Sequence, residues 1–110
     1  MIDRELLGEV LSIKVHSIEP IIINEISFTT VSQHLNRDLT KPRYITVNLD
    51  TLGRLCKEWA RSKGVTIFET SFDDENNYKI RLALGWHTYE TSTETELEAI
   101  IKACEWAKDN

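Results

Sequence analysis

The sequence lacks the features that define several broad classes of protein. It has only two cysteines in 110 residues, too few for a small secreted domain held together by disulfides. Apolar runs such as 21–23 are far shorter than the roughly 18 residues of a membrane span. The first five residues include two acids and show no basic start followed by an apolar stretch, unlike a signal peptide. We therefore expect a cytoplasmic protein with reduced thiols.

Positive charge is also scarce. Thirteen Lys and Arg stand against eighteen Asp and Glu, giving a net charge of -5 and a pI near 5.2. Duplex DNA and anionic membranes both need a positive surface, so we expect a generic binder of neither. The charge is uneven, however. Residues 37–63 hold seven bases and three acids, whereas residues 73–110 hold four bases and nine acids.

The motifs of catalysis and of metal binding are missing as well. The four glycines, at 8, 53, 64 and 85, form no phosphate-binding loop and no nucleophile elbow. His16, His34 and His87 lack the spacing of a zinc site. Cys56 and Cys104 fall on apolar helix faces, where a reactive thiolate is disfavoured. We expect no enzyme, no metal and no cofactor.

Apolar residues are plentiful enough for a core. Leu, Ile, Val and Phe fill 31 of 110 positions, above the roughly 20% below which chains tend to be disordered. Helical spacing predicts an amphipathic helix over 49–63, with Asp50 as its cap and Gly64 after its last turn. The apolar face of this helix is formed by Leu52, Leu55, Cys56 and Trp59.

Further helices are predicted near both ends of the chain. Residues 93–96 read as a capping box, with Thr93 as the cap and Glu96 three residues later. The helix after it has Leu97, Ile100, Ile101 and Cys104 on one face. A short helix is predicted over 3–11, and another through Val31, Leu35 and Leu39.

The period of the pattern changes to two between the long helices. Residues 65–72 and 78–87 flank a polar turn and predict an antiparallel hairpin, with Trp86 on its apolar face and His87 on its polar face. Residues 44–48 predict another strand. Residues 13–28 predict either two strands or an edge strand with a bend, because Pro20 interrupts the pattern. The fold predicted is α+β: a single domain, 1–110, with a mostly antiparallel sheet of three to five strands covered by amphipathic helices.

Two helical segments carry a resemblance to known proteins. Residues 55–64 read LCKEWARSKG and residues 96–106 read ELEAIIKACEW. In these segments the chain resembles small uncharacterised phage and prophage proteins, in which a CKEWA helix precedes a hairpin and an E-AI-KACEW helix closes the domain. The resemblance implies accessory genes of bacterial viruses, a class that includes anti-CRISPR inhibitors of host defence. It carries over no catalytic residue.

The leading hypothesis is a non-enzymatic phage or mobile-element protein that binds and modulates a host protein, such as a nucleic-acid-binding defence complex. A carboxylate-rich surface suits this role because it can occupy a nucleic-acid channel on the partner. The candidate contact residues are Asp73, Asp74, Glu75, Glu94 and Glu96.

Two alternatives stay open. Arg54, Lys57 and Arg61 lie on the exposed side of the helix over 49–63, at spacings of three and seven, and would suit a nucleotide or another phosphate ligand. A subunit of a homo-oligomeric enzyme, with its site formed between copies, is the other alternative.

Overall fold

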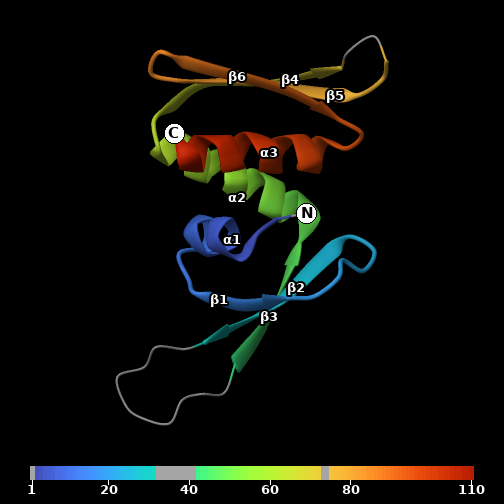
Figure 1. The fold of residues 1–110 in the computed structure, drawn as a ribbon. Coiled ribbons are helices and arrows are strands. Elements are labelled where there is room, and N and C mark those ends of the chain that lie inside the picture. The colour runs from blue at the N-terminus through green and yellow to red at the C-terminus, as the bar shows by residue number, and fades with distance from the viewer. Residues whose placement is uncertain (1, 32–41, 73–74) are drawn as a thin grey trace. The chain divides into compact units, whose positions relative to one another are not determined.

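The computed structural model describes residues 2–31, 42–72 and 75–110, which form two compact units. We call Ile2–Leu52 the amino-terminal unit and Gly53–Asn110 the carboxyl-terminal unit. Each contains a three-stranded antiparallel sheet and helical segments (Figure 1). The predicted α+β class is confirmed, and the strands divide between two sheets.

The amino-terminal unit is a helix followed by a meander of strands. Its elements are α1 (Arg4–Leu11), β1 (Val15–Ile18), β2 (Glu25–Val31) and β3 (Pro42–Asn48), with the strands in the order β1-β2-β3. Asp3 caps α1, because its side chain accepts a hydrogen bond from the Leu6 N–H at 2.7 Å. The predicted helix over 3–11 and the two strands on either side of Pro20 are confirmed.

The core of the amino-terminal unit lies between α1 and one face of its sheet. Leu6 and Leu7 of α1 are fully buried, as is Phe28 of β2, and Ile26 is nearly so. The alternation along β2 sends Ser27 and Thr29 to the opposite face. A helix is predicted through Val31, Leu35 and Leu39. Val31 is instead the last residue of β2, and Leu35 and Leu39 lie outside the described residues.

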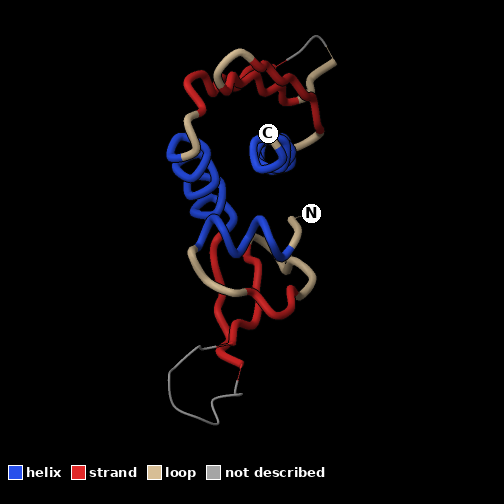
Figure 2. The backbone as a smooth tube through the Cα atoms, turned by 60° about the vertical axis from the view of Figure 1, so that its left-hand side comes forward, coloured by secondary structure: helices blue, strands red, loops and turns tan. Residues whose placement is uncertain are grey.

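The carboxyl-terminal unit places its strands before its last helix. α2 (Leu49–Ser62) crosses from one unit into the other, and is followed by β4 (Val65–Phe72), β5 (Tyr78–Leu84), β6 (His87–Thr93) and α3 (Glu96–Asp109). The strand order is β4-β5-β6, and α3 packs against β5 and β6 on one face of the sheet (Figure 2). Ile80 and Leu82 of β5 and Ile101 and Cys104 of α3 fill the core.

Both long helices are confirmed, but their predicted caps are wrong. The Asn48 side chain accepts from the Asp50 N–H at 2.8 Å, so Asp50 lies in the first turn of α2 rather than ahead of it. Thr95 caps α3 by accepting from the Glu98 N–H at 3.2 Å. Thr93 ends β6, and the cap therefore lies two residues later than predicted.

The strand predicted over 78–87 is two strands. β5 ends at Leu84, β6 begins at its pairing partner His87, and Gly85 and Trp86 form the turn. Gly85 has φ +60, which suits the first central residue of a two-residue hairpin turn. The placement of Trp86 on an apolar strand face is therefore wrong, and its side chain is 99% exposed.

Candidate functional site

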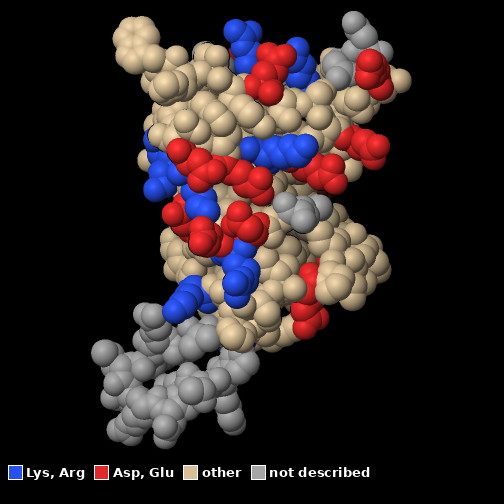
Figure 3. Space-filling view, viewed as in Figure 1, with Lys and Arg blue, Asp and Glu red and all other residues tan. Residues whose placement is uncertain are grey.

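The described acidic candidates gather at one end of the carboxyl-terminal sheet. Tyr78 pairs with Thr93, so the β4–β5 turn and the β6–α3 connection lie at the same end of the strands. Glu75 lies in that turn, Glu94 in that connection, and Glu96 begins α3. Figure 3 shows acidic side chains at this end of the unit. We call these three residues the acidic end.

The members of the acidic end differ in their surroundings. All three are exposed, and the amino terminus of α3 favours the nearby carboxylates through the helix dipole. Glu96 also has a cation beside it, because its Oε1 lies 3.5 Å from Nζ of Lys57. Glu75, in the β4–β5 turn, and Glu94, in the β6–α3 connection, are the residues to test first, while Asp73 and Asp74 lie outside the described residues.

Two of the basic candidates on α2 are paired with acids. Arg54 Nη1 is 3.0 Å from Oε1 of Glu58, and Lys57 is paired with Glu96. Arg61 lines a surface pocket together with Glu69 of β4. These carboxylates lower the positive potential that a phosphate ligand would require.

The two cysteines belong to the core of the carboxyl-terminal unit. Both thiols are free and buried, as the helix patterns predict. Cys104 Sγ lies 3.4 Å from the Cys56 carbonyl oxygen and donates to it. Hydrogen bonding with Cys56 and burial raise the pKa of the Cys104 thiol, so it is protonated at neutral pH. This environment stabilises the fold and disfavours a nucleophilic Cys104.

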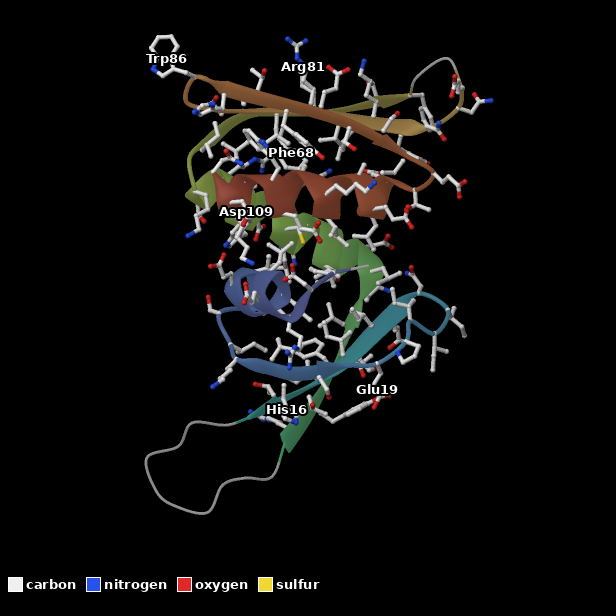
Figure 4. The ribbon with its side chains drawn as sticks, in the orientation of Figure 1. His16, Glu19, Phe68, Arg81, Trp86 and Asp109 are labelled. Carbon is white, nitrogen blue, oxygen red and sulfur yellow. The ribbon has the colours of Figure 1, made fainter. Side chains whose placement is uncertain are left out.

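Trp86 is a candidate contact that the sequence pattern misplaced. It projects from the β5–β6 turn into solvent at the end of the sheet opposite the acidic end (Figure 4). Tryptophan is among the residues most enriched at protein-binding hot spots. The sequence signal for this exposure is Gly85. A glycine followed by one further residue, between two runs in which polar and apolar residues alternate, is typical of a tight hairpin turn.

The remaining candidates are isolated. His16 and His87 are exposed and belong to different units, and His34 lies outside the described residues. Within 2–31, 42–72 and 75–110, no group of three or more His, Cys, Asp or Glu is placed to hold a metal ion. None of the helices in this described part of the chain is long and apolar enough to cross a membrane. No protein-family model, curated protein or solved structure matches the chain.

Proposed function

We propose that the chain is a non-enzymatic accessory protein of a phage or mobile element, which binds a host protein and modulates it. The acidic end is the contact surface, and a basic surface that normally holds nucleic acid is the kind of site it would occupy. The host setting follows from the resemblance of the helices over 55–64 and 96–106 to phage proteins.

The observation that carries this proposal is the strand register of the carboxyl-terminal unit. Glu75 and Glu94 are nineteen positions apart in the sequence, yet the pairing of Tyr78 with Thr93 brings their segments to one end of the sheet. A compact group of like charges steers an oppositely charged partner and raises its association rate.

Charge reversal at the acidic end provides the test. The double variant Glu75→Lys with Glu94→Lys should lose capture of its partner from bacterial lysate, measured by quantitative mass spectrometry against the unaltered chain. The same loss should appear with the purified partner, as an association rate at least about tenfold lower at low salt. Added salt should slow binding of the unaltered chain, because salt screens exposed charges.

A matched control separates this surface from overall charge. Glu25→Lys with Asp109→Lys changes the net charge equally, at exposed positions in β2 and at the end of α3. This control should retain capture, and all variants should keep the circular dichroism spectrum of the folded parent. Equal loss in both double variants would show a dependence on net charge and reject the acidic end. Full capture by the Glu75/Glu94 variant would reject it as well.

A further inference from the structure

The strand β4 is an open edge of the carboxyl-terminal sheet. Among the strands in the described part of the chain, its one neighbour is β5, with which it pairs from Val65 to Phe72 with a register shift between Val65 and Ile67. Alternate residues of an edge strand direct their N–H and C=O groups away from the sheet, where another extended chain can pair with them. β4 also follows α2 after a two-residue connection, so the last turn of α2 lies close to the start of this edge.

A surface pocket of about 400 Å³ lies along this edge. Its lining residues are Arg61 from α2 and Val65, Thr66, Phe68 and Glu69 from β4. Phe68 and Glu69 are neighbours whose side chains point to opposite faces of the strand. Because both line one pocket, the pocket lies beside the strand backbone rather than over one face of the sheet.

The side chains along β4 indicate what an added strand would meet. Phe68 points towards α3 (Figure 4), and Phe72, on the same face by alternation, is 64% exposed and packs on Tyr78 with ring centroids 4.5 Å apart. Arg61 gives the pocket a cation near the start of the strand, and Glu69 gives it an anion on the other face.

The opposite edge of the sheet, β6, has a pocket of its own. It is smaller, at about 290 Å³, and is lined by Lys79 of β5 and by Glu90, Thr91 and Ser92 of β6. Two of these charges already pair, since Lys79 Nζ lies 2.6 Å from Glu90 Oε1. The β4 pocket is the larger of these two pockets, and it holds the aromatic ring of Phe68 beside a cation and an anion, so we take β4 as the edge with side-chain specificity.

We propose that β4 binds an extended segment of a partner protein by strand addition. Backbone hydrogen bonds to the open edge supply affinity, and the pocket selects the side chains. The segment carries an acidic side chain towards Arg61 and apolar side chains towards Phe68 and Phe72. The segment also carries a basic side chain towards Glu69. This side chain lies three residues from the acid, on the other face of the added strand. This site shares no residue with the acidic end, and either proposal can fail alone.

Synthetic peptides test the proposal directly. The probes are Ac-Ser-Glu-Thr-Val-Lys-Val-Ser-NH2 and its reversed sequence, which together cover the two strand directions. We expect one of them to bind the full chain saturably in fluorescence anisotropy, and to slow hydrogen exchange of β4 amides but not of β6 amides. Its counterpart with Glu and Lys exchanged should bind about tenfold more weakly, because each charge then faces its like.

Variants of the pocket charges make the result specific. Arg61→Glu should weaken the preferred peptide about tenfold, whereas Arg54→Glu, an exposed arginine on α2 outside the pocket, should leave affinity unchanged. The double variant Arg61→Glu with Glu69→Arg should instead prefer the charge-exchanged peptide. Binding of neither probe, or equal binding of all peptides, would overturn the proposal. So would dimerisation of the chain alone with protection of β4, since a second copy would then be the occupant.

Discussion

Each unit packs a helix against a three-stranded antiparallel sheet, and the exposed sheet faces of the two units differ in chemistry. In the amino-terminal unit α1 precedes the sheet, and in the carboxyl-terminal unit α3 follows it. Hydroxyl pairs link strands of the first sheet, with Ser17 Oγ 2.6 Å from Thr29 Oγ1. The second sheet carries charges instead, including the Lys79–Glu90 pair. A similar scaffold thus presents a hydroxyl-lined face in one unit and a charged face in the other.

The tight turns of the two sheets differ in a second way. Ile23 and Gly85 occupy corresponding positions, each the first central residue of a two-residue hairpin turn. Their φ angles are +57 and +60. Glycine adopts this backbone readily, whereas a β-branched residue does so at a cost. Gly85 therefore suits the backbone of the carboxyl-terminal turn, whereas Ile23 strains the backbone of the amino-terminal turn. The Ile23 side chain is also 95% exposed.

The largest expected effect comes from truncating a buried side chain in the core of either unit. Phe28 and Leu82 are both fully buried, one in each unit. Phe28→Ala should lower the free energy of unfolding by about 3–5 kcal/mol, and Leu82→Ala by about 2–5 kcal/mol, through lost burial and the cavity left behind. Urea denaturation followed by circular dichroism measures the first variant. Tryptophan fluorescence measures the second, because all three tryptophans lie in the carboxyl-terminal unit.

Thr88→Ala serves as the control for these core variants. Thr88 is exposed on β6, and its truncation should change the free energy of unfolding by no more than about 0.5 kcal/mol. Core variants that cost less than about 1 kcal/mol would contradict the assignment of Phe28 and Leu82 as packed centres.

Sequence patterns predicted the elements whose burial follows a clear period. The helix through Leu52 and Trp59 and the strand through Ile80 and Leu82 have apolar residues at 3.6- and 2-residue spacing, because one face of each meets a core. The prediction is wrong about the end of that strand, at Trp86, because polar and apolar residues can alternate through a tight turn as they do along a strand. The capping error at Thr93 has a similar cause, as Thr95 is an equally good cap two residues on.

The site depends on pairing that local patterns do not contain. The sequence predicts the acidic candidates as one set of residues, and the register between β5 and β6 is what brings Glu75 and Glu94 to one end of the sheet. The ion pair between Lys57 and Glu96 joins segments 39 positions apart, so no local spacing indicates it. The pocket on β4 likewise needs the strand order, which tells which strand is an edge.

An exchange of turn residues is expected to have the next largest effect. A left-handed backbone destabilises an ordinary residue by about 1–2 kcal/mol, and glycine avoids this cost. Glycine loses more conformational freedom on folding, however, which lowers the free energy of unfolding by up to about 1 kcal/mol. Ile23→Gly should therefore raise the free energy of unfolding by roughly 0.5–1 kcal/mol, and Gly85→Ile should lower it by a similar amount. Chemical denaturation measures both. Effects of the same sign would show that the two turns are not equivalent.

The smallest expected effect separates the two sheet faces by their response to salt. Lys79 and Glu90 are partly exposed, so Glu90→Gln should cost only about 0.2–1 kcal/mol at low ionic strength. That cost should shrink as salt screens the pair. In the other sheet, Ser27 Oγ lies 3.0 Å from Thr46 Oγ1, and Thr46→Val removes this bond without removing charge. Its effect on the free energy of unfolding should be equally small but independent of salt. Denaturation of both variants at low and high salt measures the contrast, and a salt-dependent effect of Thr46→Val would contradict an uncharged contact between Ser27 and Thr46.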